Sequence, residues 1–365
     1  MVIISTSIFG TALNPLTTKP VDVYRIVMTN NNNMSVAILT LGATIQMIKY
    51  PDKHGNIEDI CLGFDNVQGY IDHKTKYIGT IIGRVANRVA QAKFPLDEKE
   101  CCLTKNFKDK HQLNGGFIGF DSMIWQLMEE NENGIKLQHI NPAGSEGYPG
   151  ELNTTITYDL DDNNNFGIFI EATTNRKTPV NISNNLYLNL AGHNTRKETL
   201  FQHNIMIKSN KIVECDNELI PTGCLMPLKH TPYDLRKYVN LGKRLKKFFN
   251  YPNKGFHNNY CIDSCEGQVK PIAKVIHPCT GRWLEIFSDQ PSVHFSTCND
   301  WPDIDKAGAE PIIGKSRAVY AQYGAFCLAC QNYPDAMNQC NFPNVFIGPK
   351  QKYCHTVVYR FGCCE

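Results

Sequence analysis

Short runs of apolar, β-branched and aromatic residues recur along the chain, with polar residues alternating between them. The run ELNTTITYDL at 151–160 alternates residue by residue, which is typical of a β-strand that buries one face. Amphipathic stretches with the longer period of a helix are scarce. The pattern therefore predicts an all-β protein. Comparable strand-like runs lie at 24–28, 34–39, 166–174, 204–209, 273–278, 282–288 and 355–361.

Clusters of asparagine, aspartate and glycine separate these runs, namely NNNN at 30–33, NENG at 131–134 and DDNNN at 161–165. Such side chains bond to their own main chain and tolerate left-handed backbone, so they predict turns. Many short strands joined by turns predict a large antiparallel β-sandwich. Because the chain has no internal repeat at a fixed period and no low-complexity linker, we expect a single domain over 1–365.

The charge of the chain is nearly balanced, with 37 Lys and Arg against 35 Asp and Glu and a formal net charge of +2. No basic run of the kind that binds a phosphate backbone occurs, so we expect no nucleic-acid partner. Long apolar runs are absent, and the N-terminus MVIISTSIFGTALNPL lacks the pattern of a signal peptide. We therefore expect no membrane association and a cytoplasmic location.

The chain has 15 cysteines, which lie in apolar runs without the spacing of a disulfide framework. This favours buried, reduced thiols. Cys327 and Cys330 form a C-x-x-C pair within GAFCLACQ, but this run is predicted to be a strand, in which residues three apart point to opposite faces. We expect packed thiols here rather than a redox or zinc pair.

Several motifs follow one another in order along nearly the whole chain: IIGRVANRVAQAKFPLD at 81–97, GSEGYPGELNTTITYDL at 144–160, PVNISNNLYLNLAG at 179–192 and CLACQNYPDAMN at 327–338. With these motifs the sequence resembles the aldose 1-epimerase (galactose mutarotase) family. The resemblance implies a single large antiparallel β-sandwich, the galactose mutarotase-like supersandwich, with a sugar cleft across one face. It also implies that neither a metal nor a cofactor takes part.

Interconversion of the α and β anomers of an aldose needs a base for the anomeric hydroxyl and an acid for the ring oxygen. The resemblance places the family's catalytic glutamate at Ala329 in CLACQ, its catalytic histidine at Asn185 in SNNLYLNLAG, and a second histidine at Asn114 in QLNGG. A methyl group and an amide cannot exchange a proton near neutral pH. We therefore expect that none of the family's catalytic positions is intact.

The resemblance also marks positions that bind the sugar. The family's aspartate falls on His257 in KGFHNNY and its glutamine falls on His294 in QPSVHF, whereas Asn87 and Arg88 in GRVANRVA match the family. For Arg88, two roles stay open, because its guanidinium could bind a ligand or brace the loop that carries it. The predicted ligand contacts are Asn87, Arg88, Asn114, Asn185, His257 and His294.

Alternatives for the cleft follow from the same residues. His257 and His294 could form a relocated acid and base or, with a third ligand, a metal site. We favour a pair of packed polar histidines, because no carboxylate replaces Ala329. The cleft could also be closed, either by Asn114, Asn185 and His257 bonding to one another or by two leucines that reshape its wall. Those leucines are Leu186 and Leu188.

Three hypotheses about function result. The first is a pseudoenzyme that keeps the fold and binds a monosaccharide, another small polar ligand or a protein partner. The alternative is an active epimerase that interconverts anomers of galactose, glucose or a related sugar through a remodelled site. The third is a structural or signalling protein that uses its outer surface, including Cys363 and Cys364 near the C-terminus.

Overall fold

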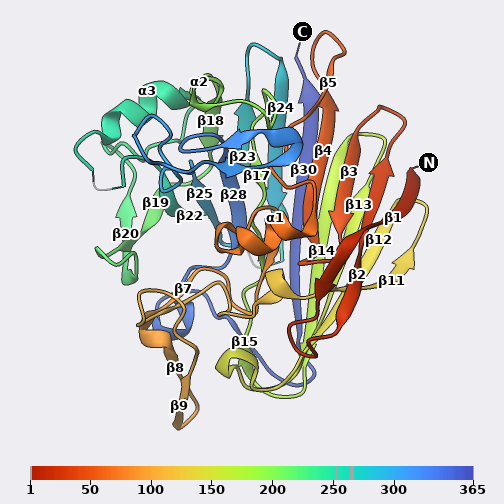
Figure 1. Ribbon diagram of the computed structural model, residues 1–365. Coiled ribbons are helices and arrows are strands. Elements are labelled where there is room, and N and C mark those ends of the chain that lie inside the picture. Colours follow the sequence, from red (N-terminus) through yellow and green to blue (C-terminus); the bar gives the residue numbers. More distant parts are fainter. Residues whose placement is uncertain (1, 252, 264–266, 365) are drawn as a thin grey trace.

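The computed structural model describes residues 2–251, 253–263 and 267–364, and antiparallel sheets dominate it (Figure 1). One five-stranded sheet lies at the N-terminus, and the larger two sheets combine strands from the rest of the chain. The N-terminal sheet has the order β1 (Ile3–Leu13), β2 (Pro20–Thr29), β3 (Ser35–Leu39), β4 (Thr44–Pro51), β5 (Ile57–Asp59).

The nine-stranded sheet has the order β11 (Gln126–Glu130), β12 (Gly134–Asn141), β13 (Leu152–Leu160), β14 (Asn165–Thr174), β30 (Lys352–Cys363), β24 (Arg282–Ser288), β23 (Lys270–Ile276), β18 (Asn204–Ile207), β21 (Val239–Asn240). The six-stranded sheet has the order β17 (Tyr187–Leu188), β28 (Phe326–Gln331), β25 (Ser292–Ser296), β22 (His257–Cys261), β19 (Lys211–Cys215), β20 (Pro221–Pro227).

Short strand pairs and short helices complete the described fold. The pairs are β6 (Ile81–Ile82) with β16 (Ser183–Asn184), β7 (Arg88–Val89) with β10 (Gln112–Leu113), β8 (Lys93–Leu96) with β9 (Lys99–Cys102), β15 (Thr178–Pro179) with β29 (Phe346–Ile347), and β26 (Ile312–Ile313) with β27 (Val319–Tyr320). The α-helices are α1 (Val67–Asp72), α2 (Lys197–Leu200) and α3 (Leu241–Leu245). Within the described ranges, no helix has the length and apolar character needed to cross a membrane.

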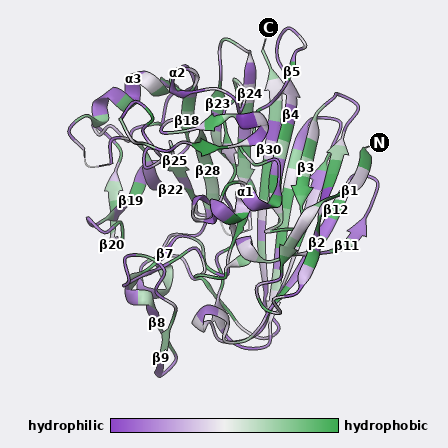
Figure 2. Cartoon of the chain, in the orientation of Figure 1, coloured by the Kyte–Doolittle hydropathy of each residue, from purple (hydrophilic) through white to green (hydrophobic). Residues whose placement is uncertain are grey.

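The strand predictions are confirmed, because every predicted run lies largely within a strand of the three main sheets. In β13, buried and half-buried residues alternate along the whole strand, as the sequence pattern requires. Figure 2 shows hydrophobic and hydrophilic stretches alternating along the strands. The largest buried cluster joins side chains from all three sheets, among them Ile38, Ile156, Phe295 and Leu328.

The predicted turns are confirmed together with their mechanism. The Asp161 carboxylate accepts the backbone N–H of Asn163 at 2.8 Å and that of Asn165 at 2.9 Å. The Asn30 amide oxygen accepts in the same way from Asn32 and Met34, both at 3.0 Å. Side chains that bond to nearby main chain thus set the ends of these strands.

The described cysteines are all free thiols, and Cys265 lies outside the described residues. Cys330 packs into the largest buried cluster and Cys327 into a second one, so the prediction that this pair faces opposite sides of a strand is confirmed. The prediction of burial is wrong for several others, because they occupy outward positions of strands or turns. The exposed thiols are Cys102, Cys224, Cys279, Cys340, Cys354, Cys363 and Cys364.

Two neutral histidines in the core make the stability of the fold depend on pH. His203 donates from Nδ1 to the Thr199 carbonyl at 3.0 Å and accepts the Leu190 N–H at Nε2 at 3.1 Å. The ring centre of His277 lies 4.7 Å from that of His203. Burial, and then the neighbouring imidazole, lowers the pKa of His203 to about 3; burial, and then Arg282, lowers the pKa of His277 to about 4. Between about pH 4 and pH 6.5 the unfolded chain therefore binds protons at these two histidines that the folded protein does not bind.

We expect the free energy of unfolding to be fully maintained above about pH 6.5, the ordinary histidine pKa, and to fall as the pH drops toward about 4. At about pH 5.5 the two histidines together should lower it by roughly 3 kcal/mol relative to neutral pH. Urea denaturation at a series of pH values measures this slope. His277→Gln removes one of these groups and should lessen the loss between neutral pH and about pH 5.5 by roughly 1.4 kcal/mol, while other buried histidines such as His257 still contribute to the slope; an unchanged slope would contradict the assignment.

Candidate functional site

A polar cavity of about 260 Å³ lies over β22, β25 and β28 of the six-stranded sheet and is called the cleft below. It is also lined by residues from the loops around positions 75–77, 82–88, 107–114 and 300–301. The structure brings every predicted site residue to this one cavity. These residues are Asn87, Arg88, Asn114, Asn185, His257, His294 and Ala329.

The register of the three strands sets the floor of the cleft. Asn259 on β22 pairs with His294 on β25, and His294 pairs with Ala329 on β28. Directly paired residues of antiparallel strands place their side chains on the same face, so these three form one row. His257 lies two residues before Asn259 and points to the same face. The Gln331 amide donates to the Asn259 side-chain oxygen at 2.6 Å and extends this polar floor.

Asn114 and Asn87 hold two loops together at one edge of the cleft. Both have left-handed backbone, with φ of 53° and 67°, which asparagine tolerates better than most residues. The Asn114 N–H donates to the Asn87 carbonyl at 2.9 Å, and the Asn87 N–H donates to the Asn114 side-chain oxygen at 2.8 Å. Asn114 therefore connects the two loops by hydrogen bonds to the Asn87 main chain.

Asn185 uses both ends of its amide within the protein. Its Nδ2 donates to the Tyr77 carbonyl at 3.2 Å and to the Tyr187 hydroxyl at 3.3 Å, and its Oδ1 accepts from the Cys327 thiol at 3.3 Å. An amide held in this way can orient neighbouring groups but cannot exchange a proton near neutral pH.

Neither arrangement that would close the cleft occurs. Asn114 bonds to Asn87 and Asn185 to Tyr77, so the prediction that these asparagines and His257 bond to one another is wrong, because different loops hold them. Leu186 and Leu188 are also not wall residues of the cleft. Both are 2% exposed and pack into the largest buried cluster.

The two histidines of the floor are in contact and neutral. Their ring centres lie 4.6 Å apart, with the planes at 83°. The Arg88 Nη2 lies 3.2 Å from His257 Nε2, and because a guanidinium only donates, His257 accepts there and carries its proton on Nδ1. Burial, and then Arg88, lowers the pKa of His257 to about 3, and burial holds the pKa of His294 well below its ordinary value. Such imidazoles are weak bases at neutral pH.

Among the described residues, no acidic or thiol ligand completes a metal site beside the two histidines. Across the described ranges, the structure contains no group of three or more His, Cys, Asp or Glu side chains placed to hold a metal ion. His294 Nδ1 is buried and has no hydrogen-bond partner. Both histidines line the cleft.

Arg88 is a buried cation at the edge of the cleft, 7% exposed. Its Nη1 donates to the Asn87 side-chain oxygen at 3.1 Å, and its guanidinium carbon lies 4.9 Å from the centre of the Phe107 ring. Nε has no acceptor. Burial lowers the pKa of Arg88 to about 10, so the group stays charged at neutral pH.

Sequence reasoning missed the aromatic and charged rim of the cleft. The Tyr187 ring centre lies 5.0 Å from that of Trp301, and the Lys76 ammonium lies 6.0 Å from the Trp301 ring centre. Asp300 is an exposed carboxylate on the same rim. Tyr187 lies within the matched stretch SNNLYLNLAG and could have been found there. Lys76 ends a short 3-10 helix (Lys74–Lys76) and Asp300 lies in a turn, and both are outside any matched motif.

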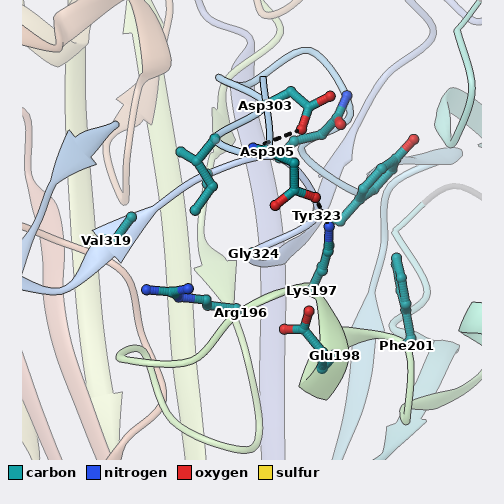
Figure 3. Close-up of a pocket in the computed structure, with 12 residues that line it drawn as sticks. Arg196, Lys197, Glu198, Phe201, Asp303, Asp305, Val319, Tyr323 and Gly324 are labelled. Carbon is teal, nitrogen blue, oxygen red and sulfur yellow. Dashed lines mark hydrogen bonds and ion pairs between the residues drawn. The ribbon is translucent and has the colours of Figure 1, made fainter. Parts of the chain in front are cut away.

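Another cavity of about 260 Å³ lies beside α2 and contains both acidic and basic side chains (Figure 3). Lys197 extends toward Asp305 and pairs with it, and Asp303 pairs with Lys306 at 3.2 Å. The opposite charges largely neutralise one another. This cavity is therefore a weaker candidate for a ligand site than the cleft.

The architecture is that of an antiparallel β-supersandwich with a cleft on one sheet, a class that includes sugar epimerases. Residues 24–360 match the family model described as aldose 1-epimerase. The chain is 37% identical to galactose mutarotase of Rattus norvegicus over 332 residues, which cover 91% of this chain and 92% of that protein. It is 38% identical to galactose mutarotase of Homo sapiens over 329 residues, which cover 90% and 91%.

Among solved structures, the GalM/aldose epimerase homologue from C. elegans superimposes with a TM-score of 0.82 at 24% identity, over 92% of this chain and 98% of that one. This likeness confirms the predicted fold. The family match and the identity to the mutarotases confirm the predicted resemblance: the protein belongs to the aldose 1-epimerase family.

Proposed function

We propose that this protein is a non-catalytic member of the aldose 1-epimerase family that binds a monosaccharide or a related small polyol in the cleft. One observation carries the proposal. Among the described residues that line the cleft, the positions where the resemblance places the base and the acid hold Ala329 and Asn185. Asp300, the one carboxylate among the described residues that line the cleft, is exposed on the rim rather than placed on the floor.

The chemistry supports this proposal. A general acid or base typically contributes a factor of about 100 to 10,000 in rate. Removal of both leaves little beyond the spontaneous reaction, although such losses are not additive. The neutral histidines do not replace them, because the pKa of His257 is lowered to about 3 by burial and the adjacent guanidinium. Polar side chains such as Gln331 and Ser296 still offer hydrogen bonds to hydroxyl groups.

The proposal also covers the location of the protein, its domain organisation and a protein partner. A cytoplasmic location accords with the free thiols of the described cysteines, since reducing compartments keep thiols free. A single domain accords with a core cluster that draws on all three sheets. The proposal also includes a protein partner on the outer surface, which is compatible with a ligand in the cleft.

Polarimetry of freshly dissolved α-D-galactose and α-D-glucose tests the proposal directly. We expect equilibration at the rate of buffer alone at every protein concentration, because no acid and base face each other across the cleft. Galactose mutarotase of Rattus norvegicus serves as the positive control. A rate that rises in proportion to the concentration of this protein would refute the proposal and direct attention to His257 and His294.

A further inference from the structure

The cleft contains a buried positive charge without a counter-charge. The Arg88 guanidinium meets two neutral groups, the Asn87 amide oxygen at 3.1 Å and the His257 imidazole at 3.2 Å, and its Nε has no acceptor. Within the part of the chain that the structure describes, no carboxylate forms an ion pair with Arg88. A buried charge in this state is unfavourable unless a further group compensates it.

Arg84, earlier in the same GRVANRVA motif, shows how this fold satisfies a buried guanidinium. Its Nε and Nη2 donate to the Asn141 side-chain oxygen at 3.0 and 2.6 Å, and its Nη1 donates to the carbonyls of Pro149 and Gly150, each at 2.9 Å. Each of its side-chain nitrogen atoms therefore has an acceptor. The unsatisfied donor of Arg88 is a feature of the cleft and not a general property of buried arginines in this protein.

The other charges that face the cleft leave it positive. Lys76 lies over the ring of Trp301 on the rim. Asp300 attracts Arg88 only at a distance and is exposed to solvent. Since His257 and His294 are neutral, two cations face one carboxylate among the described lining residues.

We propose that the cleft binds a small polyol that carries an anionic oxygen group, either a carboxylate or a phosphate, beside Arg88. The inference rests on the proposed function, because it names the ligand class of the same cleft. A guanidinium presents its N–H donors as a planar fork that matches the oxygen pair of either anion. The resemblance to the family supports the same ligand class, because it places a carboxylate at each of the two positions that His257 and Ala329 occupy in this chain.

Calorimetric titration of the full-length protein with D-galactose, D-galacturonate and D-galactose 6-phosphate compares a neutral sugar with its carboxylate and phosphate forms. We expect at least one charged sugar to bind roughly 10- to 100-fold more tightly than galactose, the range for hydrogen bonds to charged groups. The charged sugar that binds more tightly identifies the anion. Arg88→Gln should abolish this difference, whereas Arg196→Gln, which removes an exposed arginine outside the cleft, should preserve it.

A second variant keeps the guanidinium and supplies the missing counter-charge. His257→Asp places a carboxylate where the imidazole now meets Arg88, so the ratio of the affinity for the charged sugar to the affinity for galactose should fall by roughly 10-fold or more. The result with this variant stays informative even if the Arg88→Gln protein fails to fold. Its thermal unfolding midpoint is expected to match or exceed that of the parent protein.

The outcomes separate the two proposals. Equal binding of neutral and charged sugars, with no effect of His257→Asp, overturns the inference and leaves polyol binding in place. Binding of none of the three sugars overturns both. If the protein binds the charged sugar preferentially and also speeds its anomeric equilibration, the inference stands and the non-catalytic function is wrong.

Discussion

Asn185→His combined with Ala329→Glu is expected to raise the rate of galactose mutarotation by at least about 100-fold over the unaltered protein. The resemblance places the family's acid and base at these two positions, and both residues line the cleft. Ala329 faces it from β28, directly opposite His294 on β25. Because acid and base act as one unit, each single substitution should give far less than the pair. Polarimetry and NMR of the anomeric protons measure the rate.

The matched control is Asn185→Gln with Ala329→Gln, which adds bulk at the same positions without a group that exchanges protons near neutral pH. A further variant adds His257→Asp and His294→Gln, so that the floor no longer presents two imidazoles to the new carboxylate. Asn114 stays unchanged in this series, because its amide oxygen accepts the N–H of the Asn87 backbone. If the restored variants fold but equilibrate galactose no faster than the glutamine control, the residues at positions 185 and 329 do not account for the proposed lack of catalysis.

The fold could be predicted from the sequence because its signals are local. Alternation in β13 follows from one buried face, and the turn at Asp161 follows from side-chain bonds to nearby main chain. The opposite facing of Cys327 and Cys330 follows from strand geometry alone. Such features depend only on residues that are close together in the sequence, so a short stretch of sequence is enough to predict them.

The environment of each residue in the cleft could not be predicted in this way. The contact between His257 and His294 depends on the register of β22 and β25, and the rim formed by Lys76 and Asp300 depends on how distant loops meet. The exposed thiols of β30 show the same limit, because the sequence does not reveal which positions of a strand meet solvent. The motif GRVANRVA presents two arginines that look equivalent, and only their surroundings distinguish them.

Arg84→Met is expected to lower the free energy of unfolding by about 5 kcal/mol or more, which is comparable to the whole stability of many domains. Arg84 is 1% exposed, and its guanidinium satisfies Asn141, Pro149, Gly150 and Thr178 at 2.6 to 3.1 Å. Each buried acceptor left without a donor costs about 1 to 3 kcal/mol. Urea denaturation followed by circular dichroism measures the loss, and Arg84→Lys should fall between parent and methionine variant, since one ammonium cannot reach all these acceptors.

Arg88→Met is the matched control, because it makes the same change in the same motif at a guanidinium with two neutral hydrogen-bond partners. We expect it to lower the free energy of unfolding by less than about 1 kcal/mol, since it leaves few acceptors without a donor and removes a buried charge whose Nε has no acceptor. Equal losses in the two variants would mean that the unsatisfied donor of Arg88 has no energetic consequence, and the case for an anionic ligand would lose its basis. A large loss at Arg84 alone would mean that one arginine of the motif holds the fold together, while the charge of the other is available to a ligand.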